Sequence, residues 1–348
     1  MENYDMTIIG SGILGSILAY QANRLNPDMK ILNVNKNSDN NQTFKSQFYI
    51  HRGHFYLDKR LTSKLNNTFV NWVSLIRDLG LTTYENRSFI GFYENSDAWI
   101  QNWMDADIPF KEVNVKNLMG YEMNLNKVYA FPHVLIDGNE LMNKLVNETQ
   151  VQSIQNEIKA IHPTGDGYEI SFNSGKVIKS KKISICAGGG TDEVISKIKD
   201  ADFNIGIQHR FCQVLVLSGN LPNLSLLVPD QQTFIAPQYD QLEGLKWLCT
   251  YGEDPIIKER DGTDTLDFER VKQQLEHLKN IFPTLSNYVT NSKMYTARKV
   301  ESSMLGNGHR PNDVFVENLN EDIAVCLPTK LSLAFEASNT IMNKLSIN

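Results

Sequence analysis

The chain has 348 residues, of which 41% are hydrophobic and 21% charged, and its formal net charge is -6. This composition is ordinary for a folded protein, and the length suffices for two joined lobes. The negative charge argues against a nucleic-acid binder, because phosphate contacts need a concentrated basic surface and no Lys/Arg run is longer than Lys179 to Lys182. No apolar run approaches the roughly 20 residues of a membrane span, and no signal-peptide pattern precedes the first strand, so we expect a cytoplasmic protein.

The four cysteines each lie in an apolar, strand-like stretch, and none belongs to a CxxC pair. They are Cys186, Cys212, Cys249 and Cys326. Isolated cysteines in apolar strands are typical of buried free thiols, whereas metal sites use closely spaced ligands. We therefore predict four unpaired thiols and no bound metal.

The first informative motif is the apolar run from Tyr4 to Ile9, which continues into Gly10-Ser11-Gly12-Ile13-Leu14-Gly15. In a GxGxxG turn the glycines allow a tight turn, close approach of a pyrophosphate and close packing of the following helix. A helical pattern over residues 13–25 and a second strand over residues 30–34 complete a βαβ unit. The start of the chain therefore predicts a dinucleotide site at the N-terminus of a helix.

The next elements follow from periodicity and turn residues. The Asn-rich segment 33–42 predicts a surface loop, and residues 61–80 predict a helix ended by Gly80. Thr164 to Gly167 predicts a hairpin between two alternating strands. The remaining predicted elements are a helix over 139–146, a strand over 182–187 that ends in three glycines, strands over 208–217, 233–237 and 245–251, a helix over 266–281, a strand over 323–327 and a final helix to about 345.

The order of these parts resembles the D-amino acid oxidase (DAO) family of FAD-dependent oxidoreductases, which includes glycine and sarcosine oxidases and 2-hydroxy acid dehydrogenases. Besides the glycine turn, the segments 129–146, 156–194 and 208–217 carry the resemblance. It implies an α/β fold with a Rossmann-like FAD-binding domain and a second α+β substrate domain on a largely antiparallel sheet. The expected FAD-binding domain comprises residues 1–80, 135–200 and 290–348, and the substrate domain comprises 81–134 and 201–289.

The resemblance also implies where FAD binds. The pyrophosphate would lie on the turn Gly10, Ser11, Gly12, Ile13, Leu14 and Gly15, and the adenosine beside Asn35, Lys36 and Ile158. Further contacts would come from Ser46, Arg52, Ala187 and Gly188, and the turn Pro328, Thr329, Lys330 and Leu331 would lie beneath the isoalloxazine. A helix start suits that edge of the ring, which becomes negative on reduction.

Three positions depart from the family pattern. Asn35 stands where the family has a ribose-binding Glu, Phe211-Cys212 replaces an Arg-Gly pair, and Leu327 to Lys330 replaces a glycine-rich flavin loop. An amide accepts a hydrogen bond from a hydroxyl more weakly than a carboxylate does. These departures predict a lower affinity for FAD or a different loop geometry.

The candidate catalytic residues are Arg298, His51, His54 and Tyr239. Arg298 could hold a substrate carboxylate, with Arg310 as a competitor and an ordinary salt bridge as the alternative. The two histidines could transfer protons near neutral pH, while the alternatives are structural hydrogen bonding, a covalent link to the flavin, or a metal for which no third ligand follows. Tyr239, like Tyr251, could bind a carboxylate or simply pack.

The leading hypothesis is an FAD-dependent oxidoreductase that oxidises a small amine, amino acid or 2-hydroxy acid by hydride transfer to flavin N5. Such an enzyme would have a small-molecule substrate and no nucleic-acid or membrane partner, and the sequence leaves its oligomeric state open. The alternatives are a flavoprotein-like subunit that has lost redox activity and serves as a binding partner, or a non-redox flavin enzyme. The departures at Asn35 and at the C-terminal turn motivate the first of these.

Overall fold

The structure is a computed structural model. It describes residues 1–36, 43, 48–84, 87–114, 121–199, 203, 205–240, 244–252, 256–257, 268–306, 311–327 and 330–347. Four of the predicted site residues, Ser46, Arg310, Pro328 and Thr329, lie outside these ranges, and Arg298 is described by its backbone alone.

The first of three sheets formed by the described strands is built on the N-terminal βαβ unit. Strands β20, β12, β1, β2 and β9 lie side by side in that order, and all four pairings between them are parallel. The predicted hairpin β10–β11 continues the sheet antiparallel to β12, with Thr164 opposite Gly167, and β19 pairs with β20. The strands of this eight-stranded sheet are β1 (Glu2–Ile9), β2 (Ile31–Asn35), β9 (Gln152–Gln155), β10 (Ile158–Thr164), β11 (Gly167–Phe172), β12 (Val177–Ile185), β19 (Phe315–Asn318) and β20 (Ile323–Leu327).

Helices cover one face of this sheet. Met6 and Ile8 of β1 pack on Leu14 and Leu18 of α1 (Ile13–Leu25) and on Ile341 of α8 (Ala334–Lys344). The opposite face packs on the β10–β11 hairpin and on α5 (Thr191–Ile195). Because the central strands are buried on both faces, they read as continuous apolar runs, as parallel strands do.

A second helical layer packs on the outer side of α1. It consists of α2 (Lys59–Asp78) and α4 (Gly138–Asn147), whose buried apolar side chains meet those of α1. Each helix begins at an aspartate: Asp58 accepts the Leu61 N–H at 2.9 Å, and Asp137 accepts the Asn139 N–H at 2.7 Å. Gly80, with φ of +56°, lies just past the end of α2, as predicted for a helix C-terminus.

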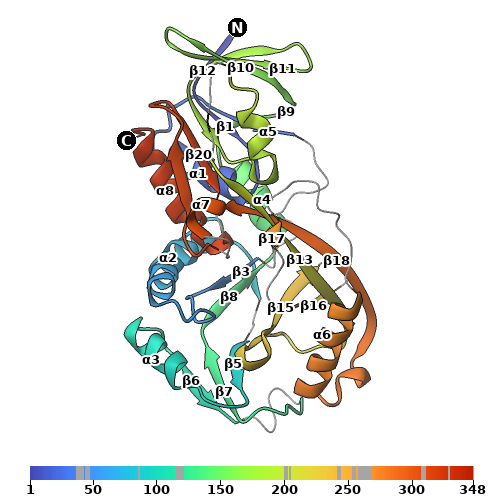
Figure 1. The fold of residues 1–348 in the computed structure, drawn as a ribbon. Helices are drawn as coiled ribbons and strands as arrows, with labels where there is room; N and C mark the ends of the chain where they lie inside the picture. The colour runs from blue at the N-terminus through green and yellow to red at the C-terminus, as the bar shows by residue number, and fades with distance from the viewer. Residues whose placement is uncertain are drawn as a thin grey trace.

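A nine-stranded sheet forms the lower half of the molecule in Figure 1. Its order is β17-β13-β16-β15-β14-β5-β7-β6, with β18 also paired to β13, and every pairing except β14–β5 is antiparallel. The helix α6 (Phe268–Ile281) packs on one face. The strands are β5 (Arg87–Phe92), β6 (Lys111–Val113), β7 (Lys127–Phe131), β13 (Ile207–Gly219), β14 (Leu224–Val228), β15 (Thr233–Asp240), β16 (Gly244–Tyr251), β17 (Ile256–Ile257) and β18 (Val289–Ser302).

A small sheet of order β3-β8-β4 lies between the two large ones in Figure 1. It consists of β3 (Tyr49–His51), β4 (Thr83–Tyr84) and β8 (His133–Ile136). The remaining helices are α3 (Asp97–Asp105), α7 (Ser303–Gly306) and the short 3₁₀ turns η1 (Gly188–Gly190), η2 (Pro229–Gln231), η3 (Leu285–Asn287) and η4 (Leu331–Leu333). No helix of the described chain is both long and apolar enough to cross a membrane.

The fold class is the predicted one, and the four cysteines are buried free thiols as predicted. One expectation is wrong: the loop predicted from residue 33 begins later, since Asn33 and Asn35 belong to β2 and Asn33 is buried. The structure also places β18 with the nine-stranded sheet, whereas the sequence had assigned residues from 290 onward to the first domain. The division into two domains stays a prediction, and the β13–β18 pairing favours moving β18 to the substrate side.

Candidate cofactor and substrate site

The turn after β1 has the backbone that its glycines predict. Gly10 has φ of +116°, and a Cβ on it would lie 2.3 Å from the carbonyl oxygen of Cys186, the residue after the neighbouring strand β12. A Cβ on Gly15 would lie 1.9 Å from the Gly10 carbonyl oxygen. Only glycine fits either position, so strand and helix approach each other as closely as a phosphate-binding turn requires.

The start of α1 carries backbone amide groups of the kind that bind anions. Gly12 is the N-cap, and no acidic residue occurs in the first turn to compete for these N–H groups. The Ile13 N–H is bonded to the hydroxyl of Thr43 at 3.0 Å, so a neutral acceptor already lies at this helix start. A phosphate is a stronger acceptor for the same amides.

Most of the predicted cofactor-binding residues meet at one edge of the eight-stranded sheet. The turn from Gly10 follows β1, Lys36 follows β2, Ala187 and Gly188 follow β12, and Lys330 follows β20 by three residues. These four strands are parallel, so their carboxyl ends lie together, which is where ligands bind in open α/β sheets. Gly188 has φ of +51° and open space where a Cβ would be.

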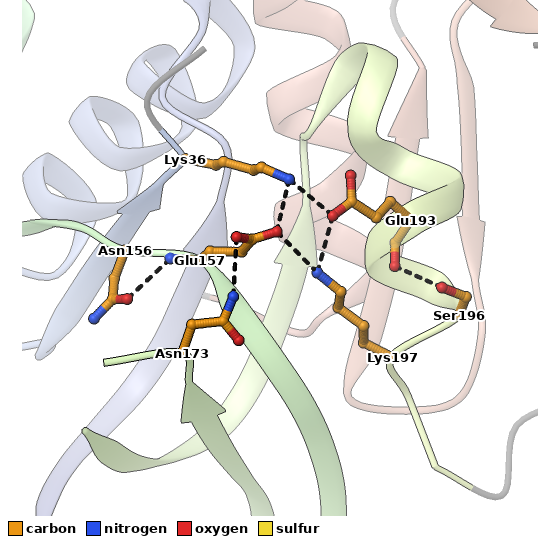
Figure 2. A network of polar contacts seen from close by, with 7 residues as sticks. All are labelled: Lys36, Asn156, Glu157, Asn173, Glu193, Ser196 and Lys197. Carbon is orange, nitrogen blue, oxygen red and sulfur yellow. Dashed lines mark hydrogen bonds and ion pairs between the residues drawn. The ribbon is translucent and has the colours of Figure 1, made fainter. Parts of the chain in front are cut away.

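The end of β2 carries a network of four charged side chains, shown in Figure 2. Lys36 lies 2.7 Å from Glu157 and 2.9 Å from Glu193, and Lys197 lies 2.9 Å from Glu193 and 3.6 Å from Glu157. Hydrogen bonds from Lys197 and Lys36 lower the pKa of Glu193 to about 2, and Lys36 lowers that of Glu157. Both carboxylates are therefore ionised at neutral pH.

His51 lies on β3 in a ring of aromatic side chains. Its Nδ1 accepts the Gly53 N–H at 3.0 Å, so the neutral ring carries its hydrogen on Nε2. The rings of Tyr49, Phe55 and Tyr56 lie 5.4, 5.4 and 5.8 Å from that of His51. His51 is therefore a buried histidine whose tautomer is set by the backbone.

His54 has a different environment. It is fully buried, stacks on Phe131 at 4.3 Å, and its Nε2 lies 2.8 Å from the Ser88 hydroxyl. Its Nδ1 has no hydrogen-bond partner among the described residues. Burial holds its pKa well below 6.5, so the ring is neutral at physiological pH.

A hydrogen-bond chain that the sequence did not reveal joins His54 to the nine-stranded sheet. Ser88 and Ser225 are register partners on β5 and β14, and the Tyr49 hydroxyl lies 2.7 and 3.0 Å from their hydroxyls. Both serines are fully buried. The only sequence signal for them is a lone serine within each apolar strand, and such a residue needs a partner that sequence cannot name.

The C-terminal turn contacts the His51 segment. Lys330 is buried, its Nζ lies 5.0 Å from the centre of the Tyr56 ring, and it donates to the Pro311 carbonyl at 3.4 Å. Tyr56 is also the aromatic neighbour of His51. The structure thus brings together two segments, 51–56 and 330–331, that the sequence assigned independently to the flavin.

Other predicted residues lie apart from this cluster or in other contacts. Arg52 is directed at α2, with its guanidinium 4.4 Å from the Phe69 ring and Nη1 2.7 Å from Asn66. Tyr239 is 38% exposed and stacks on Tyr84 at 4.3 Å. The backbone of Arg298 lies opposite Phe211 in the β13–β18 pair. The first residue of β10, Ile158, is buried beside the charged network.

Two histidines whose pKa values are lowered in the folded chain, His54 and His133, predict a pH-dependent stability. Burial lowers the pKa of His133, which lies opposite His51 on β8, to about 4, while an unfolded histidine has a pKa near 6.5. Between these values the unfolded chain binds a proton that the folded chain does not, so the free energy of unfolding falls as the pH falls from 6.5 to 4. The expected slope is about 1.4 kcal/mol per pH unit for each such histidine.

Urea unfolding from pH 7.5 to 4.5 measures this slope. His133→Gln is expected to flatten it, and His162→Gln, at an exposed position on β10, serves as the matched control. An unchanged slope in His133→Gln would show that His133 takes up its proton in the folded state as readily as in the unfolded one.

The structure has a parallel sheet with a glycine turn at its carboxyl edge, and the segment that contains His51 and His54 joins it to a largely antiparallel sheet. This arrangement is typical of a dinucleotide-binding protein with a second domain. Residues 5–318 match the DAO family of FAD dependent oxidoreductases. The chain therefore belongs to this family, and it is an FAD-dependent oxidoreductase. No curated protein matches it in sequence.

Solved structures share the fold at low identity. The L-alpha-glycerophosphate oxidase of Mycoplasma pneumoniae, solved with FAD bound, has a TM-score of 0.78 at 18% identity over 99% of this chain and 95% of that one. Glycine oxidase of Geobacillus kaustophilus has a TM-score of 0.75 at 10% identity over 99% and 95%. The L-proline dehydrogenase of P. horikoshii has a TM-score of 0.75 at 13% identity over 97% and 91%.

The residues at the sheet edge fit FAD. The evidence from this chain is the close-packed turn at Gly10 and Gly15, which only a glycine backbone allows, and the glycine at position 188 with open space beside it. The predictions of family and cofactor are confirmed, and family membership favours the enzyme over the predicted alternative of a redox-inactive binding subunit.

Proposed function

We propose that this enzyme oxidises a small amine, amino acid or 2-hydroxy acid, with hydride transfer from a substrate carbon to flavin N5. Bound FAD supplies the two-electron acceptor. The solved relatives are named for glycine, L-proline and L-alpha-glycerophosphate, so the fold accommodates both amine and alcohol substrates. The proposal rests chiefly on one observation, the meeting of His51, Tyr56 and Lys330 beside the carboxyl edge of the cofactor sheet.

In this proposal His51 orients the substrate. Because its Nδ1 accepts the Gly53 N–H, a neutral His51 ring carries its hydrogen on Nε2, which can donate to a substrate nitrogen or oxygen. Because burial holds the pKa of His54 well below 6.5, its ring is neutral near pH 7, and in this proposal its role is to bond the segment to Ser88. Arg298 and Tyr239 stay proposals for residues that bind a substrate carboxylate.

The buried ammonium of Lys330 adds positive charge to the flavin side of the cluster. It lies at the N-cap of η4, which leads directly into α8, so the charge and the helix start act in the same direction. Such a place favours an anion that forms during the reaction. Tyr56 separates Lys330 from His51, which keeps the two functions distinct.

Anaerobic mixing with a panel of amines, amino acids and 2-hydroxy acids tests the proposal. We expect the visible flavin absorbance to bleach with at least one of them, and His51→Asn to slow that reduction about 10²-fold, as expected when a positioning contact is lost. His162→Asn, far along β10, is the control and is expected to reduce at the wild-type rate. If no compound of the panel bleaches the flavin, the proposed substrate class is wrong.

A further inference from the structure

The ribose position of this chain lacks the acid that dinucleotide-binding folds place there. In such folds a carboxylate about 20 residues beyond the glycine turn binds a ribose hydroxyl. Here that position, at the end of β2, is Asn35. The next residue is a lysine, so β2 itself supplies no acceptor of comparable strength.

Glu157 stands beside this position. The Asn156 N–H donates to the Asn35 carbonyl oxygen at 2.8 Å, which fixes the backbone immediately before Glu157 to the end of β2. The Glu157 carbonyl oxygen in turn accepts the Asn173 N–H at 2.9 Å. Both contacts are backbone bonds, so the main chain of Glu157 is held next to the end of β2.

We propose that Glu157 replaces the missing acid and binds a hydroxyl of the FAD adenosine ribose, with Lys36 and Lys197 as positioning residues. The inference deepens the FAD site of the proposed function and rests on it. Figure 2 shows the geometry: Lys36 reaches across from β2, and Lys197 from beyond α5, to the same carboxylate.

The carboxylate has room for a further donor. A carboxylate offers about four acceptor positions. Glu157 accepts hydrogen bonds from Lys36 at 2.7 Å and from the Asn173 side-chain amide at 2.9 Å, and Lys197 forms an ion pair with it at 3.6 Å. Its side chain is 37% exposed, so a ligand can reach it.

The charges of the network suit a dinucleotide. Two acids near a pyrophosphate would repel it, but Lys36 and Lys197 neutralise Glu157 and Glu193 pairwise. Glu193 contributes by fixing the two lysines, since one of its oxygens accepts from both of them at 2.9 Å. Glu157 is the residue after Asn156, whose N–H bonds to the carbonyl oxygen of Asn35 in the ribose position.

Binding of FAD to the apoprotein, followed by flavin fluorescence, tests the inference without substrate. The probes are FAD and an FAD analogue that carries 2′,3′-dideoxyadenosine. We expect the wild type to bind FAD about ten-fold more tightly than the analogue. Glu157→Gln is expected to bind FAD about ten-fold more weakly than the wild type does, with equal affinity for FAD and the analogue. Asn35→Glu in the Glu157→Gln background is expected to restore the affinity for FAD and the preference for FAD over the analogue.

Matched controls separate this role from a structural one. Glu276→Gln breaks the exposed pair with Lys279 on α6 and is expected to leave both affinities unchanged. Equal wild-type affinity for FAD and the analogue would overturn the inference, even if Glu157→Gln did not fold. An equal loss of affinity for both probes in Glu157→Gln would also overturn it. Neither result bears on the substrate panel, which tests the proposed function separately.

Discussion

Gly10→Ala is expected to abolish FAD binding. The added Cβ would lie 2.3 Å from the Cys186 carbonyl oxygen and 3.0 Å from the Ala187 Cα, and φ of +116° is itself unfavourable for alanine. Cys186 is tied to β1 by its N–H bond to the Ile9 carbonyl oxygen at 2.8 Å, so the clash cannot be relieved without parting the two central strands. We expect FAD affinity to fall at least about 100-fold, measured as flavin content and by titration of the apoprotein.

Gly165→Ala is the matched control. Gly165 lies in the β10–β11 hairpin, and a Cβ there would meet no atom within 4 Å. This variant is expected to bind FAD as the wild type does. A Gly10→Ala protein with normal flavin content would show that the turn after β1 is wider than its backbone indicates.

Glu301→Ala is expected to lower the free energy of unfolding by about 3–5 kcal/mol. Arg210 on β13 and Glu301 on β18 form a buried pair at 2.8 Å, with side chains only 4% and 1% exposed. Removing the carboxylate leaves a guanidinium in a low-dielectric environment where water cannot replace its partner. Urea unfolding at neutral pH measures the loss.

The same substitution at an exposed pair provides the comparison. Glu276→Ala on α6 removes the partner of Lys279 and is expected to change stability by less than about 1 kcal/mol. The double variant Arg210→Met, Glu301→Leu is expected to recover much of the loss, because an apolar pair leaves no unpaired charge. A loss below about 1 kcal/mol in Glu301→Ala would mean that water reaches Arg210.

Local patterns predicted the elements that depend on neighbouring residues. The strand over 323–327 is β20, the helix predicted to end at Gly80 is α2, and the Thr164–Gly167 turn closes β10–β11. Each is specified within a few residues by periodicity, capping or turn chemistry. The prediction that a loop begins at residue 33 was wrong, because Asn33 and Asn35 belong to β2, where sheet pairing outweighs their low strand propensity.

The hydrogen bonds that join the small sheet to the nine-stranded sheet could not be predicted from the sequence. Tyr49, Ser88 and Ser225 come from three strands that are far apart along the chain, and their hydroxyls meet only because β5 and β14 pair in one register. The Arg210–Glu301 pair likewise depends on the register of β13 and β18. A shift by one residue would turn either set of side chains to the opposite face.

The sequence by itself determined the glycine turn after β1, because the conformational freedom of glycine and the start of a helix are local properties. Only the tertiary structure decided which side chains surround that turn. Parallel pairing carries the ends of β1, β2, β12 and β20 to one edge, and the β2–β9 pairing sets Glu157 beside Asn35 across more than 100 residues of chain. Such contacts arise from long-range strand pairing, whose register is fixed by the burial of whole strands and not by any one motif.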